Sequence, residues 1–546
     1  MSDLWDVNCL IGRWPTAELL FEDVDGLIAR MDELSIARAV VGHAGCLHFD
    51  PALGNARLTE ALGAVRPEAR ARLWPCWALV PPATGEMGTA DELASALDAH
   101  GIRAARLYPR DHNYSLSGPD AAELLGLLAQ RRTLTLLDLE QSNWEEIERV
   151  AEAFPALPFV VCNIGYRGLR RYAGVLARQP NVYIDLSYLG SHECVEWLAE
   201  RGHAQRLLFG TGAPVIDGGG AVTRLMLADL DKADREAVGS GNLAKLLGHN
   251  REPLADVAGW LKTAATTTRS LPSQAGTRSK TVPSAQVLAG GPIEGWDIVD
   301  AHAHMGPWFN FFTPEPTADS MLRVMDRCGV RLAVVSATRA IAGEVEAGNA
   351  EVVEMARRHP GRFAGYAVFN PHLPHSLADV ERTLDAPGMV GIKIHPDVQA
   401  YAVGGPLYAP AFDLAARRGV PVLTHTYADS AFSDPLMIES IAARWPEVSI
   451  ILGHAGVTGE GHRRAMAVAA KHPNLYLELC GSLTTGLWIR RMVAAVGAAR
   501  VLYGSDFPFI ELRYGLGRVV FAGLNNAELS LVLGGNARRV LGLAAD

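Results

Sequence analysis

The stretch Trp296-Asp-Ile-Val-Asp-Ala-His-Ala-His-Met-Gly306 is an apolar run that ends in two histidines one residue apart. Such a run predicts a β-strand, in which residues two apart point to the same side. His302 and His304 would then face one way at the end of the strand, where both could bind one ion. Two ordinary histidines beside a turn would give the same local pattern. The rest of the sequence is therefore needed to distinguish a metal site from two structural histidines.

The same stretch has a counterpart near the N-terminus. Asp6-Val-Asn-Cys-Leu-Ile-Gly12 parallels Asp300-Ala-His-Ala-His-Met-Gly306. Three further pairs follow in the same order: Asn181-Val-Tyr-Ile-Asp-Leu186 with Asn474-Leu-Tyr-Leu-Glu-Leu479, Leu207-Leu-Phe-Gly-Thr-Gly-Ala-Pro214 with Val501-Leu-Tyr-Gly-Ser-Asp-Phe-Pro508, and Gly241-Asn-Leu-Ala-Lys-Leu-Leu-Gly248 with Gly535-Asn-Ala-Arg-Arg-Val-Leu-Gly542. Asn242 follows Asn8 by 242 − 8 = 234 residues, and Asn536 follows His302 by 536 − 302 = 234. The chain is therefore a tandem duplication.

Each half alternates short apolar runs with longer amphipathic segments. The strands expected in the first half are residues 4–9, 37–41, 72–79, 104–108, 134–138, 159–163, 182–186 and 206–209. Those expected in the second half are residues 297–302, 331–336, 363–369, 390–395, 421–425, 449–453, 475–479 and 500–503. Eight such repeats predict a parallel barrel, which needs about 250 residues.

The predicted fold class is therefore α/β, with two tandem (β/α)8 TIM-type barrels over residues 1–255 and 293–546. A length of 546 residues is too great for one ordinary core. Between the halves, residues 256–292 are predicted to form a linker, because residues 263–291 are rich in Thr, Ser, Ala, Gly and Pro and show little apolar periodicity.

In a (β/α)8 barrel, functional side chains gather at the C-terminal ends of the strands. In the second half these ends carry His302 and His304, Gly391-Ile-Lys-Ile-His-Pro396, Pro421-Val-Leu-Thr-His425, Ile451-Leu-Gly-His-Ala-Gly456 and Tyr503-Gly-Ser-Asp-Phe-Pro508. Each has a structural explanation by itself, but five strand ends with a His, Lys or Asp at one rim predict a metal site. Imidazoles and a carboxylate suit one divalent ion, Zn²⁺ before Mn²⁺, Fe²⁺ or Ni²⁺.

This motif set resembles the amidohydrolase superfamily, over nearly all of residues 293–546. It is most similar to the amidohydrolase-related branch that includes aminocarboxymuconate-semialdehyde and resorcylate decarboxylases, together with lactone and amide hydrolases. The resemblance implies that one metal ion is bound by four residues: His302, His304, His425 and Asp506. It also implies that His454 is the catalytic histidine that orients or deprotonates water, and that Asp506 shuttles a proton.

Three further residues are candidate substrate contacts. Lys393 and His395 alternate onto one face of their strand, so either could reach substrate, whereas binuclear members of the superfamily carry a carboxylated lysine at this strand. An ion-paired structural role for Lys393 stays open. Trp308 begins an aromatic segment after the His-x-His motif and could line a planar substrate, although aromatic residues in loops often serve packing alone.

The first half lacks the proposed ligands. His302, His304, His425 and Asp506 correspond to Asn8, Leu10, Asp138 and Gly212, and His454 corresponds to Asn163. Only Asp138 could ligate a metal well. The first half is therefore expected to be a degenerate barrel without a metal site. It would pack on the second barrel like a partner subunit, or else Asn8, Arg106, Tyr108, Asp138, Glu140 and Asn163 would line a polar pocket that binds a ligand without turnover.

Composition narrows the class of partner. A net charge of −10 and the lack of basic clusters near the motifs argue against nucleic-acid binding, including a metal-dependent deoxyribonuclease. Seven scattered cysteines without a Cys-x-x-Cys pair suggest reduced thiols and a cytoplasmic location. The N-terminus shows no signal-peptide pattern, and no apolar run reaches the roughly 18 residues of a membrane span.

The leading interpretation is a metal-dependent hydrolase of a small-molecule amide, ester or lactone, which uses an ion-activated water in the second barrel. The alternative is a non-oxidative, metal-dependent decarboxylase of a carboxylated aromatic or dienoic acid, because the same ligand set serves both reactions in the resembled branch. The two barrels are expected to pack on each other, and homo-oligomers are common in the superfamily.

Overall fold

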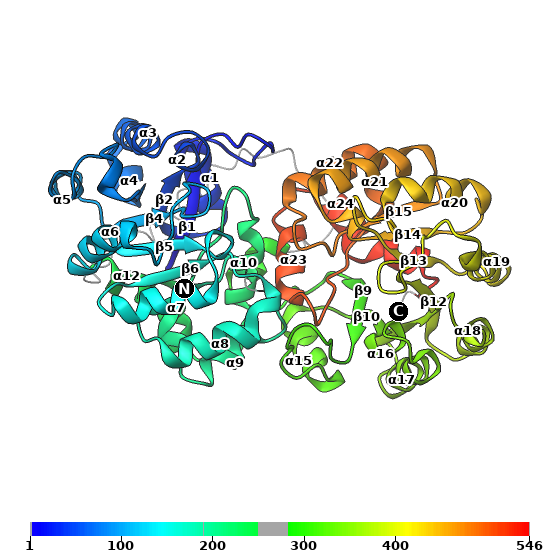
Figure 1. Cartoon of the computed structure of the whole chain (residues 1–546). Coiled ribbons are helices and arrows are strands. Elements are labelled where there is room, and N and C mark those ends of the chain that lie inside the picture. The colour runs from blue at the N-terminus through cyan, green and yellow to red at the C-terminus, as the bar shows by residue number, and fades with distance from the viewer. Residues whose placement is uncertain (1–2, 189, 249–281, 545–546) are drawn as a thin grey trace.

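The computed structural model describes residues 3–188, 190–248 and 282–544. Within them lie two eight-stranded parallel sheets with strand orders β1 to β8 and β9 to β16, each surrounded by helices (Figure 1). The predicted pair of tandem (β/α)8 barrels is confirmed. The predicted linker lies outside the described residues up to residue 281, and residues 282–292 contain one helix, α14 (Pro283–Leu288).

The first barrel follows the predicted strand pattern closely. Its strands are β1 (Leu4–Ile11), β2 (Ile36–His43), β3 (Leu73–Ala78), β4 (Ala104–Leu107), β5 (Leu134–Asp138), β6 (Phe159–Cys162), β7 (Val182–Asp185) and β8 (Leu207–Leu208). Its helices are α1 (Val24–Glu33), α2 (Gly45–His48), α3 (Pro51–Ala64), α4 (Pro67–Arg70), α5 (Ala90–Ala99), α6 (Pro119–Gln130), α7 (Trp144–Ala153), α8 (Leu169–Arg178), α9 (Cys194–Ala199), α10 (Gly218–Met226), α11 (Lys232–Glu236) and α12 (Asn242–Leu246).

The second barrel repeats the arrangement. Its strands are β9 (Val299–Met305), β10 (Leu332–Ala337), β11 (Phe363–Val368), β12 (Met389–Ile394), β13 (Val422–His425), β14 (Ile450–Gly453), β15 (Leu475–Glu478) and β16 (Val501–Leu502). Its helices are α15 (Ala318–Cys328), α16 (Thr338–Ile341), α17 (Val345–Arg358), α18 (Ser376–Leu384), α19 (Ala409–Arg418), α20 (Ile438–Arg444), α21 (Gly459–Lys471), α22 (Gly486–Val496), α23 (Leu512–Val520), α24 (Asn526–Ser530) and α25 (Asn536–Val540).

Backbone hydrogen bonds close each barrel between its first and last strands. Val7 N donates to Phe209 O at 3.0 Å in the first barrel, and Ala301 N donates to Tyr503 O at 3.0 Å in the second. Inward-facing apolar side chains from successive strands, such as Val299, Val334 and Ile451, fill the interior of the second barrel. The barrel is thus a packed core, and its polar residues can meet only at the rim.

A register shift in β9 determines the direction in which the side chains of His302 and His304 point. Asp300 pairs with Ala333, but Ala303 pairs with Val335, so β9 holds one extra residue at this point. The extra residue changes which side chains face inward, as a β-bulge does. His302 and His304 both end up buried at the rim of the barrel. The first barrel has the same shift between Asp6 and Cys9.

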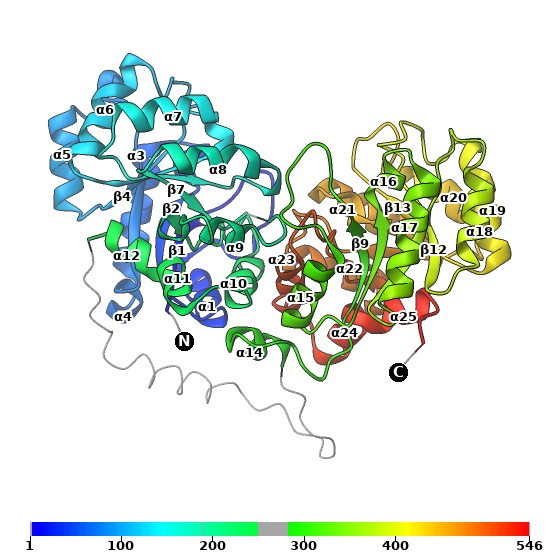
Figure 2. The same ribbon diagram turned by 90° about the horizontal axis from the view of Figure 1, so that it is seen from below.

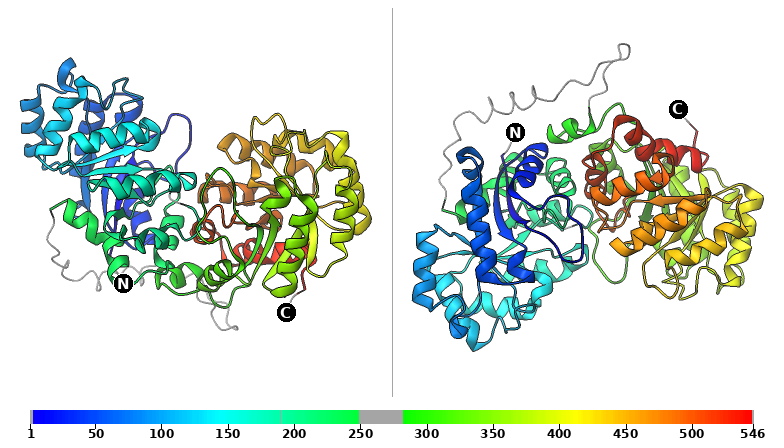
Figure 3. Two further views of the ribbon diagram at one scale, coloured as in Figure 1. Left: turned by 60° about the horizontal axis from the view of Figure 1, so that its bottom comes forward. Right: turned by 90° about the horizontal axis from the view of Figure 1, so that it is seen from above.

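The two barrels meet through α10 and α23, which lie side by side between them (Figure 2; Figure 3). Glycines permit the close approach: a Cβ added to Gly219 would lie 2.9 Å from Gly517 O. Fully buried ion pairs cross the interface, with Arg224 Nε 2.6 Å from Glu511 Oε2 and Arg513 Nη2 3.1 Å from Glu196 Oε2. Because each of these charges has a partner on the other barrel, moving one barrel against the other would leave charges buried and unpaired.

Breaking this interface network should destabilise the protein strongly. Glu511→Gln would leave Arg224 buried without its carboxylate partner and Arg513 with Glu196 alone, and breaking a buried pair in this way costs about 3–5 kcal/mol. Urea denaturation would measure the loss, and Glu447→Gln, at an exposed glutamate, should stay within about 0.5 kcal/mol of wild type. An unchanged midpoint for Glu511→Gln would show that this network does not hold the barrels together.

Two general features complete the fold. All seven cysteines are buried and unpaired. Among the helices of the described ranges, none combines the length and the apolar character that crossing a bilayer requires.

Candidate metal centre

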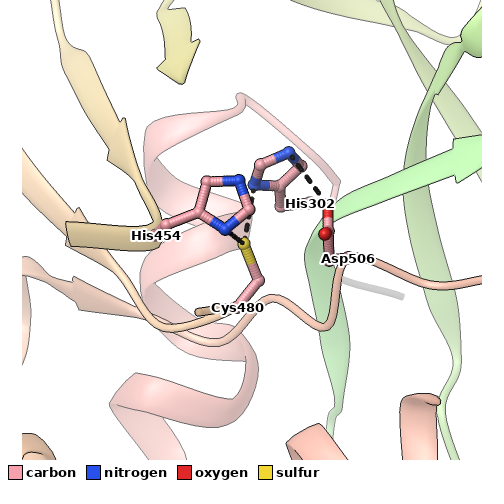
Figure 4. Close-up of side chains that lie close together, drawn as sticks. All are labelled: His302, His454, Cys480 and Asp506. Carbon is pink, nitrogen blue, oxygen red and sulfur yellow. Dashed lines mark hydrogen bonds and ion pairs between the residues drawn. The ribbon is translucent and has the colours of Figure 1, made fainter. Parts of the chain in front are cut away.

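The C-terminal rim of the second barrel gathers the predicted site residues. His302 and His304 come from β9, and His425 ends β13. His454 directly follows β14, and Asp506 lies in the loop after β16. One potential ligand atom from each of four residues, His302, His454, Cys480 and Asp506, lies within 4.8 Å of the others (Figure 4). Three of these were predicted as site residues, and Cys480 was not.

Asp506 is the carboxylate at the centre of the group. Its Oδ1 lies 3.1 Å from His304 Nε2 and 3.9 Å from His302 Nε2. Burial would raise the pKa of Asp506, but the neighbouring histidines His454, His304 and His302 reverse that effect and hold the pKa well below the ordinary value. Asp506 is therefore an ionised carboxylate in a buried, imidazole-rich setting.

The two nitrogens of His302 have different partners. Its Nε2 faces Asp506, whereas its Nδ1 lies 2.8 Å from Glu478 Oε2 and 3.1 Å from Cys480 Sγ (Figure 4). Glu478 is fully buried, so Nδ1–H is the natural donor to its carboxylate. A carboxylate behind a histidine in this way fixes the tautomer, so the lone pair of His302 lies on Nε2, the nitrogen that a metal would use.

The thiol of Cys480 lies close to the Nδ1 atoms of both His302 and His454. Its Sγ lies 3.0 Å from His454 Nδ1 as well as close to His302 Nδ1. Sequence reasoning missed both Glu478 and Cys480, although Glu478 stands in the repeated motif Asn474-Leu-Tyr-Leu-Glu-Leu479. The signal was the acidic residue that both halves keep at the end of this strand, Asp185 in the first and Glu478 in the second.

His454 and Asp506 both have left-handed backbone conformations, with φ of +64° each. This conformation costs a residue with a Cβ about 1–3 kcal/mol and clusters at functional sites. The first barrel keeps the conformation at the equivalent positions but carries Asn163 and Gly212 there, at φ of +56° and +65°. Glycine adopts this conformation without strain, so Asp506 is costlier than Gly212, whereas His454 and Asn163 are both residue types that tolerate it.

His425 and His395 lie together beside this group. Their rings stack with centroids 4.4 Å apart, and the His425 ring lies 4.6 Å from that of His454. His425 Nε2 is 3.5 Å from Asp397 Oδ2, which leaves Nδ1 for another partner. His395, predicted to contact substrate, is half-buried at the rim.

Lys393 lies deeper than the rim. It is fully buried, and its Nζ is 2.8 Å from His302 Nε2, on the nitrogen that faces Asp506. Burial lowers the pKa of Lys393 to about 8. Its ammonium group therefore lies among the proposed ligands rather than above them, and any contact with substrate would be made next to His302.

An aromatic wall stands over one side of the histidines. Phe509 stacks on His304 with ring centroids 4.8 Å apart and an interplanar angle of 19°. Trp308, a predicted substrate contact, and Phe311 lie against Phe509, with centroids 5.7 and 5.1 Å away. Phe309 is 76% exposed at the outer edge of this wall.

The donor set fits a divalent ion. Burial lowers the pKa of His302, His425 and His454 below the ordinary histidine value, so these imidazoles are neutral and have lone pairs to donate near neutral pH. Asp506 adds one negative charge. Neutral imidazoles with one carboxylate match the preference of Zn²⁺ and related first-row ions.

The first barrel keeps the frame of this centre without its ligands. Asn8 Nδ2 donates to Asp185 Oδ2 at 2.7 Å, as His302 Nδ1 bonds Glu478 in the second barrel. Arg106 Nη2 donates to Asn8 Oδ1, and its Nη1 lies 3.6 Å from Asp138 Oδ2. Asn163 Nδ2 also donates to Asp138 at 2.8 Å.

These polar groups therefore bond one another. The guanidinium of Arg106 supplies the positive charge at this point, as Lys393 does beside His302. Tyr108 is fully buried, whereas Glu140 is exposed outside the network. The arrangement favours the structural role for the first barrel over the predicted ligand-binding pocket.

The amidohydrolase family profile matches the sequence twice, over residues 5–249 and 299–543. The chain belongs to the amidohydrolase family. The two matches correspond to the two barrels, so the family assignment covers the degenerate half as well as the half that carries the histidine cluster.

Solved structures of similar fold are about one barrel long. They include 5-carboxyvanillate decarboxylase from Sphingomonas paucimobilis (14% identity, covering 46% of this chain and 100% of that chain, TM-score 0.36). They also include 2,6-dihydroxybenzoate decarboxylase from Rhizobium (17%, 45% and 99%, 0.38) and dihydroxybenzoic acid decarboxylase from Polaromonas sp. JS666 with bound manganese (17%, 46% and 98%, 0.38). At these identities the likeness concerns the fold alone. A search of the curated proteins finds no match.

Proposed function

We propose that the second barrel is a metal-dependent hydrolase of a small-molecule amide, ester or lactone. The observation that carries the proposal is the position of His454, which lies among neutral imidazoles and beside the ionised Asp506 at the catalytic rim of the barrel. A base and a ligand set in one buried group are the parts that hydrolysis by activated water requires.

His302, His304, His425 and Asp506 would hold the ion, and Zn²⁺ is the first choice, with Mn²⁺, Fe²⁺ and Ni²⁺ as alternatives. A bound divalent ion supplies Lewis acidity, which lowers the pKa of water toward about 7 and polarises a substrate oxygen. The remaining chemistry belongs to the side chains around it.

His454 is assigned as the general base. Its backbone N donates to Glu478 Oε2 at 3.1 Å and its Nδ1 lies against Cys480, so Nε2 is left to receive a proton from water. Because burial lowers the pKa of His454, the imidazole is unprotonated and ready to act as a base at neutral pH. Asp506 would carry the proton on to the leaving group, in addition to binding the ion.

Substrate contacts are assigned to Lys393, His395 and Trp308. Lys393 offers an ammonium group next to His302, and His395 an imidazole at the rim. Trp308 and Phe509 offer flat apolar surfaces beside His304. The wall of rings favours a planar or ring-containing substrate.

The same aromatic wall favours a second candidate reaction, non-oxidative decarboxylation of a carboxylated aromatic or dienoic acid. The two reactions differ in product. Protein reconstituted with Zn²⁺ or Mn²⁺ would be screened for hydrolysis of lactones, esters and amides, and for release of CO₂ from aromatic acids.

Hydrolysis that depends on the ion is the expected result of this screen. CO₂ release without hydrolysis would replace the first candidate by the second. Absence of both reactions in protein that holds its metal would contradict the proposal.

A further inference from the structure

The degenerate barrel reaches the catalytic rim of the second barrel. The loop after β9 extends toward α8 and α9 of the first barrel (Figure 2). Arg170 of the first barrel donates to Phe309 O at 2.9 Å and to Phe311 O at 3.2 Å, in the loop that follows the His-x-His strand. The first barrel thus holds a loop that begins two residues after His304.

Two more catalytic loops are held from the same side. Tyr188 Oη donates to Ser482 Oγ at 2.9 Å, two residues beyond Cys480. His192 N donates to Pro508 O at 3.3 Å, and the His192 ring lies 4.8 Å from that of Phe507, next to Asp506. The first barrel therefore contacts the loops after β9, β15 and β16, which carry or adjoin the proposed metal centre.

Tyr166 is the residue of the first barrel that joins the aromatic wall. Its ring packs edge-on against Phe311 with centroids 5.4 Å apart, and the row continues through Phe509 to His304. Tyr166 is half-buried, and burial raises the pKa of its phenol to about 12, with Arg167 lowering it and Asp506 raising it.

The hydroxyl of Tyr166 has one partner on its oxygen and none on its hydrogen. Arg167 Nε donates to Tyr166 Oη at 3.1 Å. Within the described ranges of the chain, the phenolic hydrogen has no acceptor. A positively charged donor on the oxygen makes the phenol a stronger donor, so its hydrogen is available to an oxygen of a ligand.

We propose that Tyr166, supplied by the degenerate first barrel and held by Arg167, positions substrate in the second barrel by donating a hydrogen bond to an oxygen of a planar, conjugated or aromatic ligand. This inference rests on the proposed function, because it places the ligand at the metal centre. It gives the first barrel a role in the site, because Tyr166 extends the aromatic wall beside the proposed metal centre from the half that has lost its own ligands.

The test uses the full, metal-loaded chain and matched probes. Benzoate carries one carboxylate, and the three benzenedicarboxylates add a second oxygen acceptor to the same planar ring. Isothermal titration should show that wild type binds at least one dicarboxylate more tightly than benzoate, by about tenfold, as expected for one hydrogen bond to a charged acceptor.

Tyr166→Phe keeps the ring against Phe311 and removes only the hydroxyl, so the dicarboxylate advantage should vanish while benzoate affinity stays unchanged. Arg167→Gln should lose part of the dicarboxylate advantage. Tyr183→Phe is the matched control and should keep the advantage, because Tyr183 lies on β7 and packs against the apolar cluster of the first barrel that contains Trp5 and Val7. For any substrate that is turned over, Tyr166→Phe should raise KM and leave kcat within about twofold.

Two results would overturn this inference: wild-type affinity for every probe in Tyr166→Phe, or no preference for any dicarboxylate in wild type. Metal content, measured on the same samples, separates it from the proposed function. Protein that holds its ion but shows no effect of Tyr166 contradicts the inference alone, whereas protein that binds no ion contradicts the proposed function.

Discussion

His454→Asn should keep its metal and lose turnover by about 10²–10⁴-fold, the usual contribution of a general base. Asparagine is a suitable replacement because the first barrel has Asn163 at the equivalent position, in the same left-handed conformation. The fold therefore accepts asparagine there. Steady-state rates on any substrate found by the screen, together with metal analysis of the same sample, would measure both effects.

The matched control is His375→Asn, at an exposed histidine before α18 whose side chain makes no capping bond. Its turnover should equal that of wild type. If His454→Asn remained as active as this control, the base would have to be another group, and Lys393 beside His302 would be the next residue to test.

Asp506→Asn should weaken metal binding by more than about a hundredfold. Loss of residues that only support metal ligands already costs about 10–100-fold, and Asp506 is the proposed ligand that carries the negative charge. The amide is nearly the same size as the carboxylate, and asparagine tolerates the left-handed conformation that Asp506 adopts. Competition with a chromogenic chelator would measure the affinity.

Asp319→Asn, at an exposed residue in the first turn of α15, is the control and should bind metal like wild type. Wild-type affinity in Asp506→Asn would remove Asp506 from the ligand set. Cys480, whose sulfur lies within 4.8 Å of potential ligand atoms of His302 and His454, would then be the leading replacement.

The fold was predictable because both halves of the sequence carry the same pattern of strands and motifs. Each half repeats the same motifs at the same spacing, and strands that are buried on both faces read as short apolar runs between amphipathic segments. The bulge in β9 was not predictable, because it arises from pairing with β10 rather than from the local sequence. It matters, since it sets which of residues 300–304 face the barrel interior.

The candidate site was predictable in part. His302, His304, His425, His454 and Asp506 lie together because strand ends of a parallel barrel converge on one rim. Glu478 was missed although both halves keep an acid at the end of this strand, and Cys480 was missed because a single thiol after a strand carries no distinctive spacing. Tyr166 could not be predicted at all, since its contact with Phe311 depends on how the two barrels pack.

Of the two barrels, only the second is proposed to hold a divalent ion. Metal analysis of the purified chain and of the double variant His302→Asn/His304→Leu, which installs the first-barrel residues Asn8 and Leu10, tests this proposal directly. We predict about one ion per wild-type chain and almost none in the variant. Two ions per chain would indicate a carboxylated Lys393 bridge. An ion retained by the variant would contradict the assignment of His302 and His304 as ligands, because the metal would then lie outside the second-barrel centre.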